Sequence, residues 1–307
     1  MSRPTTGIVD DGARRFLRSE VESSSAHREV PLLATLAATL APVGPGHRRV
    51  DIAAIGTTAA KAVRGELLAR AISERGFDVG SAAALGSPPE LFEEPTWQLG
   101  VVLSPWKQEI GKGCDALGPS AATTGVVDTV VRSPVGTVGF NTNTWAAMTA
   151  LEVLVGGISP RLLLLLGSGA SARSVAVAVA RRWPECAIVI AARSRERAHH
   201  LAASFGGQLL EDVDYGSSPG RRWDVVVNTT TWGETEASEA EPFGIDLDRV
   251  FLPGGRLFDL NNRVSALQHR ALTTGCAVVC GTVMQRVTNA CRAALLAYIR
   301  APSTPCN

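Results

Sequence analysis

The chain has 307 residues, of which 45% are hydrophobic and 19% are charged, and its formal net charge is +1. This length is sufficient for two domains with a sizeable core, and the composition is typical of a soluble globular enzyme or binding protein. The balanced charge excludes a basic nucleic-acid-binding surface, and the longest apolar run, residues 162–166, is far too short to cross a membrane. The N-terminus lacks the apolar segment of a signal peptide, and the six cysteines form no C-x-x-C pair. We therefore expect a cytoplasmic protein with free thiols and no metal site.

Lysine is unusually rare in this chain. Only three of the 30 basic residues are lysines, namely Lys61, Lys107 and Lys112. Lysine can lose its proton at accessible pH, whereas arginine cannot. Each lysine is therefore a candidate for a role that arginine would not fill.

The first third of the chain contains a predicted extension and the start of an α/β pattern. Residues 1–48 form the extension, with helical periodicity at 10–23 and 30–41 before the Pro- and Gly-rich segment APVGPGHRR. A buried strand at 50–56 and a helix at 61–75 follow.

The alternation of strand and helix continues towards the middle of the chain. Residues 97–106 are predicted to form a strand that leads into a loop. Residues 124–143 contain two strands joined by a Ser-Pro turn, and 144–157 a helix that ends at two glycines. This order predicts an α/β fold with largely parallel sheets.

The clearest motif begins at residue 161, where a strand of five leucines precedes GSGASA and an Ala/Val-rich helix. A uniformly apolar strand is expected at the centre of a parallel sheet that is covered on both faces. The glycines allow a tight turn and a close approach of the backbone, and the free N–H groups of the helix start suit a pyrophosphate. The motif predicts a dinucleotide-binding loop, formed by Gly167, Ser168, Gly169, Ala170, Ser171 and Ala172.

The following strand, which begins at residue 187, indicates the type of dinucleotide. An NAD site would carry Asp or Glu at the strand end. The chain instead offers Arg193, Ser194 and Arg197, whose guanidinium and hydroxyl groups suit a 2′-phosphate. The alternative is a solvated helix start with alternating charge, and we predict NADP(H).

Two further strands and a final helix complete the pattern. The strand within 221–233 ends in Asn228, Thr229 and Thr230, at the sheet edge where ligands of such folds bind. Another strand spans 255–261, and residues 276–299 supply a last strand and a terminal helix.

The order of these motifs resembles the shikimate dehydrogenase family, including its quinate-using relatives. SPWK stands for the family's Thr-x-Pro-His-Lys loop, GVVDT for Gly-x-Val-Asn-Thr, and GFNTN for Gly-Tyr-Asn-Thr-Asp. GSGASA stands for Gly-x-Gly-Gly-Ala-Ala, ARS for the Asn-Arg-Thr NADP signature, and VVNTTTWG for Val-Asn-Ala-Thr-Pro-x-Gly. LFDL and GTVM, which contains Gly281 and Met284, close the series.

The resemblance covers residues 50–300 and implies two domains with an active-site cleft between them. A substrate-binding α/β domain would comprise residues 49–147 and 276–300, and a Rossmann-type NADP-binding domain residues 148–275. By the same resemblance, Gly281 and Met284 border the cofactor.

The positions that hold the substrate differ from those of the family. The two serines that bind the shikimate carboxylate fall on Ala62 and Arg64, the loop threonine on Leu103, and the final-helix glutamine on Thr288. The family's Tyr-Asn-Pro is replaced by LNNRV. Shikimate, which is small and rich in hydroxyl groups, is a poor match for Ala62 and Leu103.

The family's catalytic lysine is kept as Lys107, but its catalytic aspartate falls on Asn143 and its substrate-binding asparagine on Asp128. Both positions border the substrate pocket by resemblance. We hypothesise an exchange, in which Asp128 partners Lys107 and Asn143 takes the hydrogen-bonding role. A nearby carboxylate would favour the charged lysine and burial the neutral one, and an acid/base catalyst needs this balance near working pH. The alternative is that Asp128 is a strand-edge residue that pairs with a surface arginine.

Further candidates for substrate binding are less specific. Arg64 would grip an acid in place of the two serines, or would be a solvated helix residue. Trp106, Trp145 and Trp232 stand beside three motif loops and are candidates to line a larger apolar pocket, although each alone is more typical of packing. The predicted substrate-binding residues are Arg64, Trp106, Thr288 and Asn141.

The sequence thus predicts an NADP-dependent oxidoreductase of shikimate dehydrogenase type that acts on a small molecule other than shikimate, with ketone/alcohol or imine/amine chemistry. Two alternatives are a non-catalytic NADP-binding sensor or regulator and a true shikimate dehydrogenase with altered ligands. A homodimer is compatible with this architecture, but the sequence identifies no interface.

Overall fold

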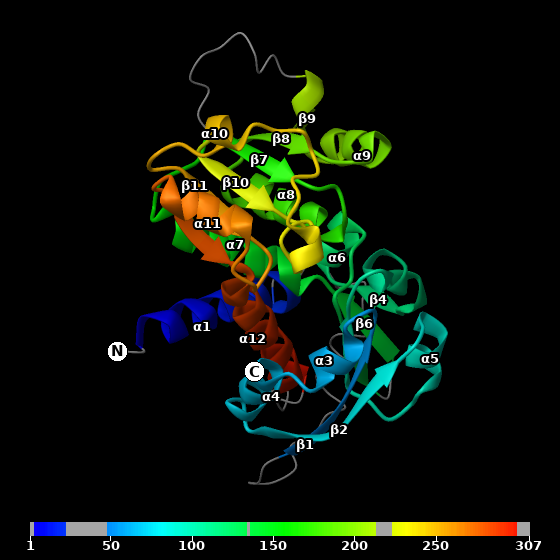
Figure 1. Ribbon diagram of the computed structural model, residues 1–307. Coiled ribbons are helices and arrows are strands. Elements are labelled where there is room, and N and C mark those ends of the chain that lie inside the picture. Colours follow the sequence, from blue (N-terminus) through cyan, green and yellow to red (C-terminus); the bar gives the residue numbers. More distant parts are fainter. Residues whose placement is uncertain (1–2, 23–47, 134–135, 213–222, 300–307) are drawn as a thin grey trace. The chain divides into compact units, whose positions relative to one another are not determined.

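The computed structural model describes residues 3–22, 48–133, 136–212 and 223–299 (Figure 1). The chain divides into two compact units. The first comprises Met1–Trp145 and Gln285–Asn307, and the second comprises Ala146–Met284. Each unit contains one six-stranded sheet, and the predicted α/β class with a Rossmann-type unit is confirmed. None of the described helices is both long and apolar enough to span a bilayer.

The sheet of the first unit has the strand order β2-β1-β3-β5-β6-β4. Its strands are β1 (Arg48–Ile55), β2 (Phe77–Leu85), β3 (Leu99–Val102), β4 (Ala116–Leu117), β5 (Thr129–Ser133) and β6 (Gly136–Phe140). β5 pairs antiparallel with both β3 and β6, while the remaining pairs are parallel. The sheet of this unit is therefore mixed, because β5 and β6 form a hairpin that reverses the chain.

The helices of the first unit are short. The predicted helix at 61–75 is two helices, α3 (Ala59–Val63) and α4 (Glu66–Ser73), because the backbone is extended at Gly65, the N-cap of α4. The remaining elements are α5 (Pro88–Glu93), η3 (Trp106–Gln108), η4 (Ile110–Gly113) and α6 (Pro119–Thr124). The central residues of their core are Ile55, Trp97, Val102 and Val130.

The described part of the N-terminal extension belongs to this unit. It forms α1 (Arg3–Leu17) and a π-helical turn, η1 (Arg18–Glu22), whereas the predicted helix at 30–41 lies outside the described residues. Phe16 is fully buried and meets Phe140 edge to face, with ring centroids 6.1 Å apart. Glu20 is also fully buried, and its carboxylate accepts hydrogen bonds from the Ser120 N–H at 2.8 Å and from Trp145 Nε1 at 3.0 Å.

The sheet of the second unit is entirely parallel, with the order β12-β11-β10-β7-β8-β9. Its strands are β7 (Leu162–Leu166), β8 (Ala187–Ala191), β9 (Gln208–Leu209), β10 (Val225–Asn228), β11 (Arg256–Asp259) and β12 (Ala277–Cys280). The predicted boundary at 275/276 therefore lies too early, because β12 pairs with β11 within this unit.

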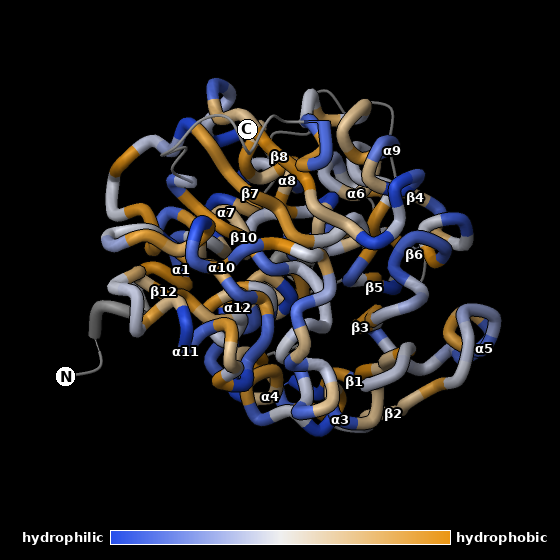
Figure 2. The backbone as a smooth tube through the Cα atoms, turned by 45° about the horizontal axis from the view of Figure 1, so that its top comes forward, coloured by the Kyte–Doolittle hydropathy of each residue, from blue (hydrophilic) through white to orange (hydrophobic). Residues whose placement is uncertain are grey.

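Both faces of this second sheet are covered. Leu164 and Leu166 pack in one apolar cluster with α11, and the alternate residues Leu163 and Leu165 are equally buried on the other face. The strands β7 and β10 are accordingly orange in Figure 2. The helices of the unit are α8 (Ala170–Arg182), α9 (Arg195–Phe205), α10 (Leu247–Val250) and α11 (Ala266–Thr273). α7 (Thr142–Val155) and α12 (Gly281–Ile299) each cross a boundary between the units.

Candidate active site

Lys107 lies in η3, directly after the loop that follows β3. Its backbone carbonyl accepts a hydrogen bond from the Val127 N–H at 2.7 Å, so the loop is tied to the residue that precedes Asp128. The Lys107 residue is half-buried, and its side chain reaches the start of α7.

Asn143 is the direct partner of Lys107. In the orientation that gives both of its amide atoms a partner, Oδ1 accepts from Lys107 Nζ at 2.9 Å. Nδ2 then donates to Asp128 Oδ2 at 3.2 Å and to Thr288 Oγ1 at 3.3 Å. The amide therefore stands between the lysine and the carboxylate.

Asp128 is fully buried and holds the N-terminus of α7. Its Oδ1 accepts from the Thr142 N–H at 2.7 Å and its Oδ2 from the Thr142 hydroxyl at 2.6 Å. Within the described residues no ion pair joins Asp128 to Lys107, and the link between them runs through Asn143. The prediction that Asp128 partners Lys107 is therefore wrong as to the direct contact: Asn143 is adjacent to the lysine, and Asp128 lies one residue further away because its carboxylate holds the start of α7.

Arg292 is the residue of this cluster that the sequence analysis missed. It lies on α12, and its side chain is 9% exposed. Its guanidinium donates to the Asp128 backbone oxygen at 3.1 Å, to Thr129 Oγ1 at 3.0 Å and to Asn289 Oδ1 at 3.1 Å, and it lies 3.4 Å from Asp128 Oδ2. The available signal was a single arginine in the otherwise apolar run ACRAALLAYI. Asp128 does pair with an arginine, as the alternative hypothesis stated, but that arginine is buried.

The electrostatics of the cluster shift Lys107 towards its neutral form. Burial lowers the pKa of Lys107 below its usual value; the Asp128 carboxylate opposes this effect, and the Arg292 guanidinium adds to it. Burial likewise lowers the pKa of Arg292, again opposed by Asp128. Two cations thus share one buried carboxylate, and the lysine is the one that can release its proton.

The predicted substrate-binding residues occupy different environments. Thr288 is buried on α12 and bonded to Asn143, so it belongs to the cluster. Asn141 is fully buried; its Nδ2 donates to Thr124 Oγ1 at 2.9 Å and its Oδ1 accepts from the Thr144 N–H at 3.2 Å, as a helix N-cap does. Its amide therefore has no face for a ligand, and the prediction that Asn141 binds substrate is not supported.

Three other candidates lie on the surface or in the cores. Arg64 is exposed at the end of α3, and its side chain makes no hydrogen bond or ion pair with any described residue. Trp106 packs against the core of the first unit. Trp232 is buried in the core of the second unit, where its Nε1 donates to the Glu239 carbonyl at 3.0 Å. Packing explains both tryptophans.

The glycine-rich loop has the backbone that the motif predicts. Gly167 has a φ of +111°, and a Cβ there would lie 2.6 Å from Thr229 Oγ1, so only glycine fits. Gly169 is the N-cap of α8, and a Cβ built on it would meet nothing within 4 Å. The helix start, Ala170, Ser171 and Ala172, therefore presents its free N–H groups next to open space beside Gly169 and Ser168. These residues fit a pyrophosphate.

The residues after β8 divide into two kinds. Ser194 is the N-cap of α9 and accepts from the Arg197 N–H at 3.4 Å. Arg195 is paired with Glu211 at 2.8 Å and with Asp212 at 3.7 Å. Arg193 and Arg197 are exposed, and neither forms an ion pair with a described residue, so these two guanidinium groups are available to an anion. Arg193 lines a cavity of 560 Å³ at this end of the sheet.

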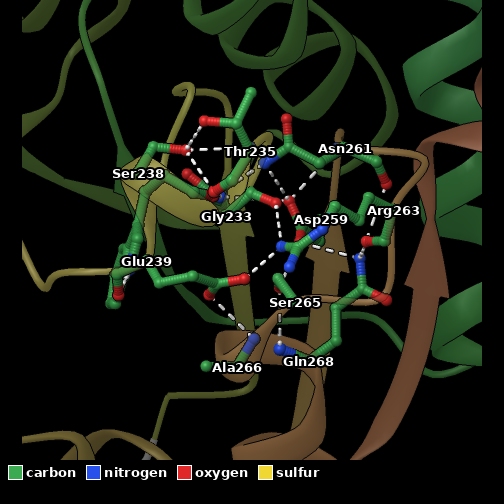
Figure 3. A network of polar contacts seen from close by, with 12 residues as sticks. Gly233, Thr235, Ser238, Glu239, Asp259, Asn261, Arg263, Ser265, Ala266 and Gln268 are labelled. Atoms are coloured by element: carbon green, nitrogen blue, oxygen red, sulfur yellow. Dashed lines mark hydrogen bonds and ion pairs between the residues drawn. The ribbon is translucent and has the colours of Figure 1, made fainter.

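The loop after β10 is organised by a buried carboxylate. Asp259, at the end of β11, accepts from Asn261 Nδ2 at 3.1 Å and from Gln268 Nε2 at 2.8 Å (Figure 3). It also accepts from Asn228 Nδ2 at 3.0 Å. Burial raises its pKa, and these hydrogen bonds oppose the increase. Asn228 is therefore a structural residue that faces Asp259.

The remaining predicted cofactor-binding residues lie around this loop. Thr229 donates to the Leu166 carbonyl at 2.7 Å, and Thr230 is half-buried beside the glycine-rich loop. Gly281, the first residue of α12, has no space for a side chain against the Leu260 backbone, and Met284 is buried.

Comparisons with known proteins agree with the motifs. No protein-family model matches the chain. A shikimate dehydrogenase (NADP(+)) of Moorella thermoacetica is 33% identical over 193 residues, which cover 60% of this chain and 64% of the relative. One from Symbiobacterium thermophilum is 32% identical over 164 residues, covering 48% and 54%. The chain thus spans between about two fifths and two thirds of the length of the curated relatives that it matches.

Solved structures share the fold. Shikimate 5-dehydrogenase of Thermus thermophilus, in complex with NADP(H) and shikimate, has a TM-score of 0.67 at 25% identity and covers 80% of this chain and 92% of its own. The 5-ketofructose reductase of a Gluconobacter strain has a TM-score of 0.65 at 19% identity, covering 80% and 91%. The resemblance to the shikimate dehydrogenase family is confirmed: the chain is similar to its members in sequence and has their fold, at modest identity.

Proposed function

We propose that this protein is an NADP-dependent oxidoreductase of shikimate dehydrogenase type whose substrate is not shikimate. The observation that carries the proposal is the cluster in which Lys107 Nζ, held 2.9 Å from Asn143 Oδ1, has a lowered pKa. Perturbed lysines of this kind are typical of acid/base sites.

Lys107 acts as the general acid/base. When a carbonyl is reduced, its ammonium donates a proton to the substrate oxygen; in the reverse direction its neutral amine takes that proton back. Asn143 orients Nζ through its carbonyl and, unlike a carboxylate, adds no negative charge that would hold the proton on the lysine. Asp128 does not contact Lys107 directly and acts through Asn143, from which its carboxylate accepts a hydrogen bond. NADP(H), when bound, supplies or takes up the hydride.

The cofactor is held by residues of the second unit. The loop from Gly167 to Ala172 takes the pyrophosphate, and Arg193 and Arg197 take the 2′-phosphate. The names of the curated relatives, which specify NADP(+), support this assignment.

The substrate differs from shikimate because the polar side chains that the family uses are missing. Ala62 and Leu103 offer no hydroxyl group, and Thr288 is engaged by Asn143. The fold neighbour named 5-ketofructose reductase supports the idea that this architecture serves other carbonyl compounds. A ketone/alcohol or an imine/amine pair fits the acid/base chemistry of a lysine equally.

The test is turnover of NADPH or NADP over a panel that contains shikimate, quinate, 5-ketofructose, amino analogues, aromatic ketones and cyclic imines. The matched pair of variants is Lys107→Ala and Lys112→Ala, the latter being an exposed lysine of η4. We expect one compound of the panel other than shikimate to be turned over. Lys107→Ala should then lose at least about a hundredfold in kcat, and Lys112→Ala should keep wild-type rates.

Two results would contradict the proposal. Efficient turnover of shikimate would make the protein a shikimate dehydrogenase with altered ligands. Tight NADPH binding without turnover of any compound, and unchanged in Lys107→Ala, would favour a sensor of the cofactor.

A further inference from the structure

The proposed function leaves one charged residue of the cluster without a role. Arg292 is a buried cation on α12, far in sequence from the strand that it contacts, and each of its nitrogens has an acceptor or an anionic neighbour among the residues around it. Burying a guanidinium is costly, so a residue that only filled space at this position would more often be apolar. The contacts of Arg292 indicate what its charge does.

The guanidinium fixes the position of Asp128. It contacts both the backbone oxygen and the carboxylate Oδ2 of this residue, at 3.1 and 3.4 Å, while Thr129 Oγ1 receives its Nε–H at 3.0 Å. Asp128 Oδ1 is meanwhile held by the Thr142 N–H at 2.7 Å. The carboxylate is therefore immobilised from two elements, α7 and α12.

A fixed carboxylate determines how the Asn143 amide is turned. The two ends of an amide have nearly the same shape, and only their hydrogen-bond partners distinguish them. Asp128 Oδ2, 3.2 Å away, can only accept, so it selects the orientation in which Nδ2 faces the acid. The carbonyl Oδ1 then faces Lys107 Nζ. In the opposite orientation two donors, Nδ2 and the ammonium, would meet.

We propose that Arg292 is a positioning residue for Lys107: it fixes Asp128, and through Asp128 it holds the Asn143 amide with its carbonyl towards Lys107 Nζ. The assignment of Lys107 as acid/base rests on the proposed function, but the positioning is a property of the protein alone and is measurable without substrate or cofactor.

The charges around the cluster determine the sign of the expected effect. Lys107 is subject to Asp128, which favours its ammonium form, and to Arg292, which opposes that form. Next to Arg292, the Cys291 thiol has a pKa raised first by burial and then by Asp128; Arg292 opposes this increase, and Arg75 and Glu20 have smaller effects. Removal of the Arg292 charge therefore leaves Asp128 uncompensated and raises the pKa of Lys107.

The experiment uses the three lysines of the full-length protein as three reporters. Trace labelling with isotopic acetic anhydride between pH 6 and 11, followed by peptide mass spectrometry, gives the reactivity of each amine against pH. In Arg292→Gln the Lys107 curve should move to higher pH, with its reactivity at pH 8 lowered by about threefold or more, because only the neutral amine reacts. Arg292→Lys, which keeps the charge, should restore most of this reactivity.

A matched control lies on the same helix. Arg286 is exposed on α12, and Arg286→Gln removes the same charge without touching the cluster, so it should leave all three curves unchanged. If Arg292→Gln does not fold, as judged by circular dichroism, Thr129→Val removes the acceptor of the Arg292 Nε–H but keeps the charge. It should move the Lys107 curve in the same direction by a smaller amount, because the guanidinium is then held less firmly against Asp128 and opposes the ammonium form less.

The outcome that overturns the proposal is a folded Arg292→Gln, or failing that a folded Thr129→Val, with the Lys107 curve of the wild type. A merely structural role would lower the melting temperature but leave Lys107 unmoved relative to Lys61 and Lys112. A shifted Lys107 curve together with an inactive wild-type protein would keep the role of Arg292 and reject the proposed enzyme.

Discussion

At the scale of single residues, the cluster differs from a lysine–carboxylate pair because an amide lies between the lysine and the acid. Lys107 meets an amide, and the acid lies behind it, where Arg292 already balances its charge. The lysine therefore has an oriented partner without the full electrostatic bias towards its ammonium form. This order is the main chemical difference from what the family resemblance implies for these positions.

An exchange of the amide and the acid between positions 143 and 128 tests this description. Asn143→Asp places a second buried carboxylate next to Asp128, and we expect it to destabilise the protein by about 2–4 kcal/mol because two adjacent acids cannot both ionise freely. The double variant Asp128→Asn/Asn143→Asp removes the repulsion. It should recover more than half of this loss in urea denaturation, and additive effects of the two substitutions would contradict the contact.

The lowered pKa of Lys107 also makes stability depend on pH. The unfolded chain binds this proton more tightly than the folded chain, so the free energy of unfolding rises as pH increases from the folded pKa of Lys107 towards the value of an ordinary lysine. Relative to Lys107→Met, the wild type should gain about 1.4 kcal/mol for each unit by which the pKa is lowered. Urea denaturation of both proteins between pH 7 and 10 measures this difference. A constant difference would show that the pKa of Lys107 is the same in both states.

At the scale of elements, the segment from β8 to α9 contains both arginines proposed to bind the cofactor and an arginine that pairs within the protein. Arg195 is bound by two acidic residues, whereas Arg197, two residues later on the same helix, has no such partner among the described residues. The effect of an arginine with acidic partners can therefore be compared with that of a nearby arginine on the same helix that has no such partner among the described residues.

The prediction for this element concerns selectivity between the two cofactors. Arg197→Ala should weaken NADPH binding by about tenfold and leave NADH binding unchanged, because one charge-assisted contact to the 2′-phosphate is lost. Arg195→Ala should change neither affinity by more than about twofold. Tryptophan fluorescence titration with both nucleotides measures the four values, and equal losses for NADPH and NADH in Arg197→Ala would show that Arg197 does not read the phosphate.

The elements that the sequence predicts best are those that depend on local pattern. The five leucines of β7 and the glycines after them fix a buried strand and a turn through residues that are adjacent in the chain, and the structure has both. The antiparallel pairing of β5 with β3 depends on which strands meet, and local pattern carries little of that information.

The sequence predicted only those residues of the candidate site that lie in a recognisable motif. The sequence identified Lys107, Asp128 and Asn143, but it did not show that Asn143 would lie between the other two. The capping role of Asn141 and the contact of Arg292 with Asp128 arise from tertiary packing, in the second case between residues 164 positions apart. A residue whose role is created by such a distant contact leaves almost no trace in its own neighbourhood.

At the scale of the whole molecule, the N-terminal helix is part of the first unit rather than an appendage. Glu20 is fully buried and receives hydrogen bonds from Ser120 and from Trp145. Because Trp145 lies on α7, two residues after Asn143, the N-terminal segment supports the same helix that carries the candidate site.

The prediction for this contact is a loss of stability. Glu20→Ala leaves the Ser120 N–H and Trp145 Nε1 buried without this acceptor, and we expect it to cost about 3–5 kcal/mol. The control is Asp11→Ala, since the exposed Asp11 pairs with the half-buried Arg15 at 3.2 Å and should contribute less than about 1 kcal/mol. Thermal unfolding of the two variants compares these effects, and similar melting temperatures would contradict the structural role of Glu20.

The first unit is also discontinuous, and this has a consequence for the order in which the protein is made. The second unit is a continuous segment, residues 146–284, whereas the first needs α12, most of which follows the second unit in the sequence. Arg292, the partner of Asp128, is synthesised 164 residues after it, which at typical translation rates means a delay of roughly 10 to 30 seconds. On the ribosome, therefore, the second unit can form while the first is still incomplete, because the part of α12 that brings Arg292 to Asp128 is synthesised after the second unit.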